Sequence, residues 1–284
     1  MTESTHRTGM IPSGDVELFY RAFGPPGSSA NRTPLLIMHG SNYFDSYDWI
    51  GVSEGLAQDR EVVAFDRRGF GHSQWSPNKD YSLDALFGDI VNVVDHFGWE
   101  RPAIMGHSMS ARLVIFFAAN FPDYVSHLIV ADSQLSNAGP GAYKVSADNK
   151  REVFESVDAA MASLVDRHSP PRFSLDRARA ELALDTVDGG YALKRDPNHG
   201  NTQSQAPGAP KPKYCDLDLW QALADVQCPI TMIGGLKSDR YKPEYCDRIA
   251  KDFPQTTMET VDSRHDMAYE APDEVVEVVR RVLA

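Results

Sequence analysis

Short, continuous apolar runs recur along the chain, and each is followed by a glycine, an aspartate or a His-Gly pair. Runs of this length without polar alternation are typical of strands buried on both faces of a parallel sheet. An earlier segment, residues 16–23, alternates apolar and polar positions, which predicts a half-exposed strand. We expect the buried strands at residues 34–38, 61–65, 103–105, 127–131 and 229–233, and a further strand at residues 256–261.

The segments between these runs carry apolar residues at helical spacing. Ser82 and Asp84 are candidate caps for a helix that runs to His96, and Gly98 ends it. Further helices are expected at residues 109–120, 243–253 and 272–283. Alternation of buried strands with helices predicts a doubly wound, mostly parallel, eight-stranded α/β sheet flanked by helices.

The alternation breaks between residues 133 and 214. This stretch holds two helix-like patches, residues 151–166 and 175–184, and no clear strand. Structureless connections of this length are uncommon in compact domains. We therefore expect a core built from residues 1–132 and 215–284, with residues 133–214 inserted as a helical lid over the carboxyl edge of the sheet.

Composition narrows the classes of partner. The 284 residues carry a formal net charge of −12, which disfavours nucleic acid and anionic membrane surfaces. We expect a small-molecule substrate, with a homodimer left open. The three cysteines, Cys215, Cys228 and Cys246, are far apart, which disfavours a disulfide framework and indicates the cytoplasm. The polar first residues predict no secretory signal, and no apolar run approaches the about 18 residues that a membrane span needs.

Ser108 lies in the stretch Gly106-His107-Ser108-Met109-Ser110, between an expected strand and an expected helix. A tight strand-to-helix turn needs small flanking residues and presents a serine at the top of the sheet. This context predicts a nucleophile. The alternative is that Ser108 caps the following helix.

A serine hydroxyl needs oxyanion donors, a base and a group that orients the base. The backbone N–H groups of Ser41, after His39-Gly40, and of Met109 are the expected oxyanion donors. His265, between the last strand and the last helix, is the expected base. The fold uses the chain order Ser–Asp–His. The acid is open between Asp239, which follows the strand before last and is preferred, and Asp132, at the end of the strand after the nucleophile helix.

Aromatic and polar residues near these motifs are candidates for lining a substrate pocket. We see no dinucleotide fingerprint and no metal-ligand spacing on a helix, so we expect no cofactor and no metal. The residues expected to bind substrate are Asn42, Tyr43, Tyr47, Trp49, His107 and Tyr241.

With these motifs in place, the chain resembles the α/β-hydrolase superfamily from about residue 16 to 283. The resemblance rests on His39-Gly40, the turn at residues 66–73, the elbow at 106–110, and His265 followed by Glu270-x-Pro272. It is closest to the serine esterase and lactonase branch, which is related to haloalkane dehalogenases and epoxide hydrolases. Those two relatives carry aspartate at the elbow, so Ser108 argues against their chemistry.

One departure concerns the acid. Many relatives place aspartate three residues after the glycine that ends the strand, and here Ser238 occupies that point. Asp239 matches only when one residue is inserted.

The resemblance implies a serine hydrolase that forms an acyl-enzyme. We expect it to cleave an ester or lactone of a small, apolar or aromatic substrate. Three alternatives remain: a carbon–carbon bond hydrolase, a cofactor-free oxygenase of a heteroaromatic with a His-Asp dyad that uses the Asp132 position, and a small-molecule receptor on the same fold.

Overall fold

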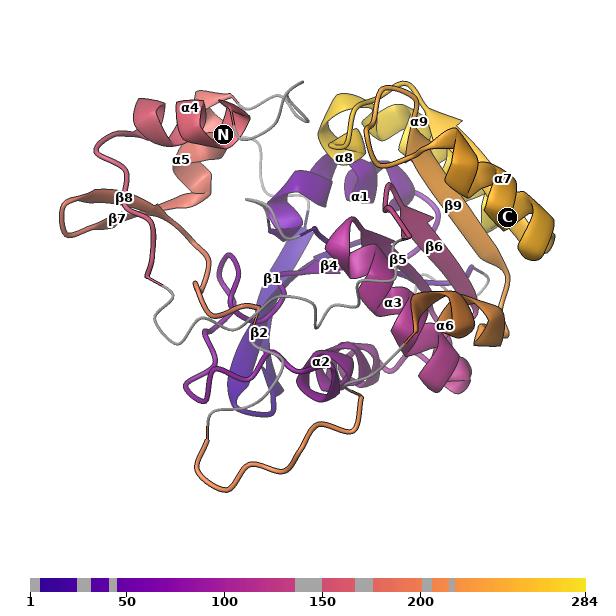
Figure 1. Ribbon diagram of the computed structural model, residues 1–284, viewed down its shortest axis with the longest axis horizontal. Helices are drawn as coiled ribbons and strands as arrows, with labels where there is room; N and C mark the ends of the chain where they lie inside the picture. Colours follow the sequence, from indigo (N-terminus) through magenta and orange to yellow (C-terminus); the bar gives the residue numbers. More distant parts are fainter. Residues whose placement is uncertain are drawn as a thin grey trace.

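The computed structural model describes residues 6–24, 32–40, 45–135, 150–166, 176–200, 206–214 and 218–284. A large twisted sheet of eight strands forms its centre, and helices cover both faces (Figure 1). From one edge to the other the strands are β1 (His6–Ser13), β2 (Val16–Phe23), β4 (Val62–Phe65), β3 (Leu35–Met38), β5 (Ala103–His107), β6 (His127–Ala131), β9 (Ile230–Gly235) and β10 (Thr256–Val261).

The sheet is parallel except at the end that carries β1 and β2. β1 pairs antiparallel with β2, and β2 pairs antiparallel with β4. All the other neighbours, from β4 to β10, are parallel. The expected fold, a mostly parallel eight-stranded sheet flanked by helices, is confirmed.

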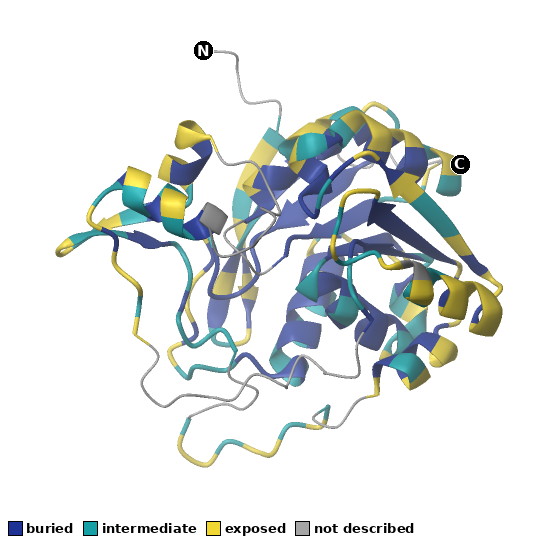
Figure 2. Cartoon of the chain, turned by 45° about the horizontal axis from the view of Figure 1, so that its top comes forward, coloured by how far each residue is buried: buried dark blue, intermediate teal, exposed yellow. Residues whose placement is uncertain are grey.

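Two apolar layers hold the helices to the sheet. One face packs against α2 (Leu83–His96), α3 (Met109–Asn120), α6 (Leu219–Asp225) and α7 (Pro243–Asp252). The other packs against α1 (Ile50–Leu56), α8 (Met267–Glu270) and α9 (Pro272–Val282). The central strands are buried between these layers, while the outer faces of the helices are exposed (Figure 2). The sequences of these central strands are continuously apolar because both of their faces are shielded from water.

Local signals account for the helix boundaries. The hydroxyl of Ser82 accepts a hydrogen bond from the N–H of Ala85 at 3.2 Å and so caps α2. Gly98, with φ of +65°, follows the end of that helix. α7 and α9 each begin at a proline, which fits the first helical position because no N–H is needed there.

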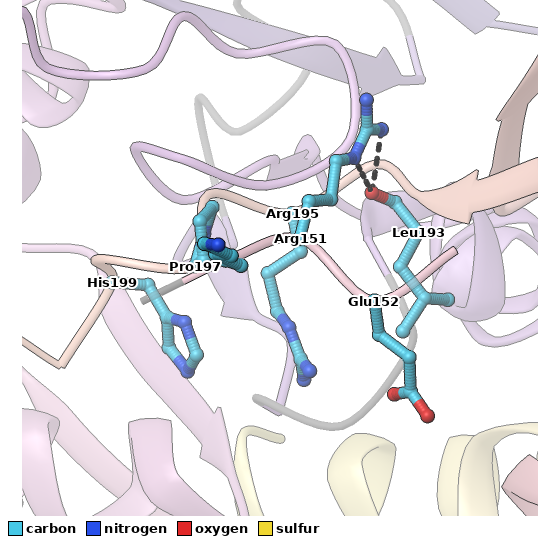
Figure 3. A pocket seen from close by; sticks show the side chains of 7 residues that line it. Arg151, Glu152, Leu193, Arg195, Pro197 and His199 are labelled. Atoms are coloured by element: carbon cyan, nitrogen blue, oxygen red, sulfur yellow. Dashed lines mark hydrogen bonds between the residues drawn. The ribbon is translucent and has the colours of Figure 1, made fainter. Parts of the chain in front are cut away.

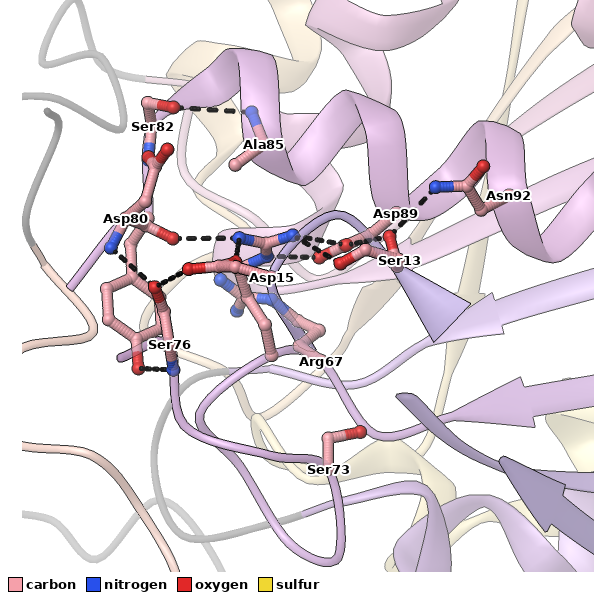
Figure 4. Close-up of polar contacts among 12 residues, drawn as sticks. Ser13, Asp15, Arg67, Ser73, Ser76, Asp80, Ser82, Ala85, Asp89 and Asn92 are labelled. Carbon is pink, nitrogen blue, oxygen red and sulfur yellow. Dashed lines mark hydrogen bonds and ion pairs between the residues drawn. The ribbon is translucent and has the colours of Figure 1, made fainter. Parts of the chain in front are cut away.

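A buried ion pair fixes the turn after β4 to the start of the chain. Arg68 donates to both carboxylate oxygens of Asp89 on α2, at 2.6 and 2.7 Å, and also reaches Asp15 at 3.2 Å. The hydroxyl of Ser13 donates to Asp89 at 2.5 Å, and these side chains converge between the β1–β2 turn and α2 (Figure 4). This bidentate contact holds the β4 turn in one orientation.

The segment between β6 and α6 forms a unit with its own small core. It contains α4 (Val157–Asp166), α5 (Arg177–Leu182), β7 (Leu184–Val187) and β8 (Gly190–Leu193), which lie apart from the large sheet in Figure 1. Phe154, Leu164, Leu184 and Leu193 are among its buried residues.

The expectation that this segment holds no strand was wrong. β7 and β8 pair as an antiparallel hairpin around Asp188 and Gly189. An Asp-Gly pair between two short runs is a strong hairpin signal, and the Asp188-Gly189 step carried it in the sequence. Two 3₁₀ turns complete the described elements, η2 (Ser46–Trp49) and η3 (Pro122–Tyr124). No helix within the described ranges has the length and apolar character to cross a membrane.

Candidate active site

Ser108 occupies a sharp turn between β5 and α3. Its backbone has φ of +57° and ψ of −114°, a conformation that costs a non-glycine residue of order 1–3 kcal/mol. The turn is tight enough that a Cβ on Gly106 would lie 2.5 Å from the carbonyl oxygen of Ser110. The side chain of Ser108 makes no capping hydrogen bond to α3, so the alternative of a helix cap is not adopted.

His265 approaches Ser108 from the loop between β10 and α8. Its Nε2 lies 3.0 Å from Ser108 Oγ, and the imidazole is 3% exposed. On the far side of the ring, Nδ1 lies 2.6 Å from Asp132 Oδ2. The carboxylate oxygen accepts, which assigns the proton to Nδ1 and leaves Nε2 to accept the hydroxyl proton of Ser108.

The preference for Asp239 as the partner of His265 is corrected by this geometry. Asp132 makes the contact, whereas the side chain of Asp239 is 42% exposed and lies 3.8 Å from Arg240. The reason is the strand order. β6 is the direct neighbour of β5, with His107 paired to Ala131, so the residues that follow them, Ser108 and Asp132, emerge side by side.

Two further donors hold the Asp132 carboxylate in place. The N–H of Gly235 donates to Oδ1 at 3.0 Å, and the hydroxyl of Ser238 donates to Oδ2 at 2.5 Å. Oδ2 therefore accepts from both Ser238 and His265. Sequence reasoning missed Ser238, although its place three residues after the glycine that ends β9 was a signal that this position faces the site.

Gly40 brings the loop after β3 against the elbow. A Cβ at Gly40 would lie 3.2 Å from Cβ of Ser108, so only a glycine allows this approach without displacement. Ser41, the expected oxyanion donor, lies outside the described residues. Met109 is the first residue of α3, where a backbone N–H has no acceptor within the helix. It remains the second expected oxyanion donor.

His39 and Ser110 support the elbow from below. The hydroxyl of Ser110 donates to the carbonyl of His39 at 2.6 Å. His39 accepts from the N–H of Arg67 through Nε2 and donates to Gly40 through Nδ1. Burial, reinforced by the Arg67 charge, lowers the pKa of His39 to about 3. It is a neutral structural imidazole.

His107 braces the base. Its Nε2 donates to the backbone carbonyl of His265 at 2.8 Å, and the two rings lie 4.7 Å apart. Burial, with the nearby His265, lowers the pKa of His107 to about 4. His107 is buried beneath the base, so this geometry favours a supporting contact over the substrate contact we expected.

The remaining residues expected to bind substrate are placed differently from one another. Asn42 and Tyr43 lie outside the described residues. Trp49 is only 2% exposed and belongs to the core under α1 and α9, which argues against substrate contact. Tyr47 is 39% exposed and lies near Arg21. Tyr241 packs its ring over Gly234, where a Cβ would collide with it.

A separate pocket of about 270 Å³ opens in the inserted segment (Figure 3). Arg151 and Arg195 line it, and Arg151 donates to the carbonyl of Leu193. Burial, followed by the Arg195 charge, lowers the pKa of His199 in this pocket to about 4. None of its lining residues belongs to the Ser108–His265–Asp132 chain.

A second polar cluster connects the inserted segment to the base, and sequence reasoning missed it. Arg179 on α5 bridges Asp48 in η2 and Asp266, the residue after His265. The only sign of this cluster in the sequence was the position of Asp266, which directly follows His265, the expected base.

The sequence and the fold place this chain in a known class. A family model described as the alpha/beta hydrolase fold matches residues 33–272. The match spans most of the chain, and this protein therefore belongs to the α/β hydrolase fold family. The resemblance stated from the motifs is confirmed.

Individual relatives also cover most of the chain. The 2-(acetamidomethylene)succinate hydrolase of Mesorhizobium japonicum is 26% identical over 228 residues, 80% of this chain and 72% of that protein. Esterase YbfF of Escherichia coli is 24% identical over 261 residues, 89% of this chain and 94% of that protein. These relatives confirm the broad prediction of a hydrolase.

Solved structures show the same fold. The thioesterase domain from the curacin biosynthetic pathway superposes with a TM-score of 0.76 at 20% identity, covering 98% of this chain and all of that chain. At this identity the likeness concerns the fold alone.

Proposed function

We propose that this protein is a serine hydrolase that cleaves an ester or lactone of a small, apolar or aromatic substrate through an acyl-enzyme. The observation that carries the proposal is the continuous chain from Ser108 Oγ to His265 Nε2, at 3.0 Å, and from His265 Nδ1 to Asp132 Oδ2, at 2.6 Å. It begins at a strained serine, which is the arrangement that nucleophilic catalysis needs.

In the proposed reaction, Ser108 Oγ attacks the carbonyl carbon while its proton passes to His265 Nε2. Asp132 stabilises the imidazolium through Nδ1–H, and Gly235 and Ser238 keep that carboxylate oriented. The N–H groups of Met109 and Ser41 stabilise the oxyanion. His265 then protonates the leaving group and activates the water that releases the acid.

One exposed aromatic ring and the names of two relatives support the substrate class. Tyr47 presents an exposed aromatic ring on the loop after β3, the loop that also carries Gly40. The names of the relatives, an esterase and a hydrolase of an acetamidomethylene succinate, support acyl substrates. The proposal needs no cofactor, and the free thiols of Cys228 and Cys246 fit a cytoplasmic location.

Reaction with a fluorophosphonate tests the proposal. We expect the intact mass of the wild-type protein to increase by one phosphonyl group, mapped to the peptide that contains Ser108. Ser108→Ala should remain unlabelled. A panel of aryl esters and lactones then defines the acyl group. A wild-type protein that resists the probe and turns over no member of the panel would refute the proposal.

One observation also favours a second function. The acid partner of His265 follows β6, the position expected for the His-Asp dyad of a cofactor-free oxygenase. In that reaction the dyad would deprotonate a hydroxylated heteroaromatic, and Ser108 would not be acylated. Oxygen consumption with such a substrate, undiminished in Ser108→Ala, would select the oxygenase over the hydrolase.

A further inference from the structure

Arg179, on α5 of the inserted segment, is buried against two carboxylates of the core. Its Nε lies 2.5 Å from Asp48 Oδ1, and its Nη1 lies 2.8 Å from Asp266 Oδ2. The side chain of Arg179 is 3% exposed, and those of Asp48 and Asp266 are 4% and 6% exposed. Buried ion pairs contribute little net stability, because desolvation offsets their attraction, but they do fix geometry.

The two carboxylates belong to segments that frame the proposed reaction. Asp266 directly follows His265 and stands at the start of α8. Asp48 lies in η2, on the loop after β3 that begins at Gly40. The Arg179 guanidinium thus joins the inserted segment to two loops of the core. One loop carries His265, the proposed base, and the other follows β3 and carries Ser41, the expected oxyanion donor.

Neighbouring contacts restrict the same guanidinium. Its carbon lies 4.5 Å from the centre of the Tyr269 ring, on α8. The hydroxyl of Tyr269 donates to Asp176, and Asp176 also caps α5 by accepting from the N–H of Arg179 at 2.8 Å. α5 and α8 are therefore joined at two points.

Two contacts anchor the backbone on the C-terminal side of His265. His107 donates to the backbone carbonyl of His265 at 2.8 Å. The next residue, Asp266, is held by Arg179. Loss of either contact loosens the backbone that carries the base, and a displacement of about 1 Å at a reacting group is enough to slow a reaction by about 10²-fold.

We infer that Arg179 is a positioning residue, which aligns His265 with Ser108 by holding Asp266 and Asp48 against the inserted segment. This inference rests on the proposed function, because it assigns the base role to His265. It extends that function to a residue from a separate part of the fold.

Removal of the arginine alone has an electrostatic consequence. Burial raises the pKa of Asp48 well above its ordinary value, and the Arg179 charge opposes that rise. Without Arg179, two buried carboxylates face each other and repel. A single variant can therefore lose stability as well as alignment, and the experiment needs variants that separate the two.

The test compares Arg179→Met with Arg177→Met. Both arginines lie on α5, but Arg177 is 58% exposed and pairs with the exposed Asp158 and Glu181. With the best ester of the panel, we expect kcat of Arg179→Met to fall roughly 10- to 100-fold. KM should change by less than about threefold, because Arg179 acts on the base and not on the substrate. Both constants of Arg177→Met should stay close to wild type.

A triple variant, Arg179→Met with Asp48→Asn and Asp266→Asn, removes every charge of the cluster. Replacing a whole buried ion cluster is far less destabilising than removing one partner, so its melting temperature should return toward that of the wild type. We expect its kcat to remain low, because the bridge between the segments is still absent. A triple variant with wild-type kcat, or an Arg179→Met variant that alters KM alone, would overturn the inference.

Two measurements, fluorophosphonate labelling and NMR, distinguish a failure of this inference from a failure of the proposed function. If the wild-type protein is labelled at Ser108 and Arg179→Met is labelled at the same rate, the inference fails while the proposed function stands. If the wild-type protein is not labelled, the proposed function fails. The alignment is then read from the NMR resonance of the His265 Nδ1–H proton, identified by its loss in His265→Gln. An unchanged resonance in Arg179→Met contradicts the inference, and a shifted or broadened resonance supports it.

Discussion

At the scale of single residues, Asp132 carries the orientation of His265. It accepts from His265 Nδ1 at 2.6 Å, whereas Asp239 is half-exposed beside Arg240. Asp132→Asn should lower kcat by about 10⁴-fold, the size seen when the orienting aspartate of a serine triad is made neutral. Asp239→Asn should keep kcat within about twofold of wild type. Steady-state kinetics of both variants on one ester measures this difference. A large loss of kcat in Asp239→Asn and a small one in Asp132→Asn would show that Asp239 is the acid.

Ser238 allows a finer test of the same carboxylate. Its hydroxyl donates to the oxygen of Asp132 that also accepts from His265. Without this hydroxyl the Asp132 carboxylate has one donor fewer to hold it against His265. In Ser238→Ala we expect kcat to fall by roughly fivefold, the effect of losing one hydrogen bond of about 1 kcal/mol. Ser238→Thr retains a hydroxyl and should keep a kcat close to wild type. Equal kcat values for all three proteins would contradict this role of Ser238.

Local sequence signals predicted Ser108 and His265 for one site but left the acid open between Asp239 and Asp132. The serine and the histidine each lie at a boundary between a strand and a helix, and such boundaries can be read from apolar spacing. The acid depends on which strand lies beside β5, and this order is a property of the whole sheet. The burial of Trp49 could not be predicted from local sequence either. An aromatic residue that follows a turn is equally compatible with a pocket wall and with the core.

At the scale of elements, the β5–α3 elbow depends on small residues. A Cβ on Gly106 would lie 2.5 Å from the backbone oxygen of Ser110, so Gly106→Ala forces the backbone apart. We expect a loss of about 1–3 kcal/mol in the free energy of unfolding and slower fluorophosphonate labelling. Gly88→Ala is the matched control, since it lies in α2 with open space around it and should stabilise by up to about 1 kcal/mol. Equal effects of the two substitutions in urea unfolding would contradict this view of the elbow.

The inserted segment shows the limit of periodicity at this scale. Its helix-like patches at residues 151–166 and 175–184 correspond to the shorter helices α4 and α5. The β7–β8 hairpin was missed because strands of four residues are too short for alternation to be distinctive. The turn residues between them were the better signal.

At the scale of the whole molecule, buried neutral histidines make stability depend on pH. The pKa of His39 is lowered to about 3 in the folded protein, against an ordinary value of 6.5. Below pH 6.5 the unfolded chain therefore binds a proton at this position that the folded protein does not, and stability falls as pH falls. Burial raises the pKa of Asp66 from its ordinary value of 3.8 to about 7. Between these two pH values the folded protein holds a proton that the unfolded chain lacks, so Asp66 makes stability rise as pH falls.

A difference measurement isolates the histidine. Between pH 6 and 4, the free energy of unfolding of the wild type should fall relative to His39→Gln by roughly 1.4 kcal/mol per pH unit, the slope for one proton. Chemical unfolding at several pH values gives both curves. Parallel curves would mean that His39 takes up a proton in the folded protein.

The overall architecture was the most predictable part of this molecule. Buried strands, helices and their alternation determine a mostly parallel sheet, because few topologies are compatible with that order. The antiparallel β1 was absent from the expectation. Its residues, His6–Ser13, mix charged, glycine and apolar positions at an edge where one side of the strand faces water.

The central claim is that Ser108 becomes acylated during turnover. Rapid quenching of the wild-type protein with an activated aryl ester, followed by mass spectrometry of the digested chain, measures this directly. We predict an acyl group on the peptide that contains Ser108, formed within the first turnover. The adduct should be absent in Ser108→Ala, which should turn over the ester at least about 10³-fold more slowly. Turnover of the same ester without an adduct, at a rate that Ser108→Ala retains, would contradict it.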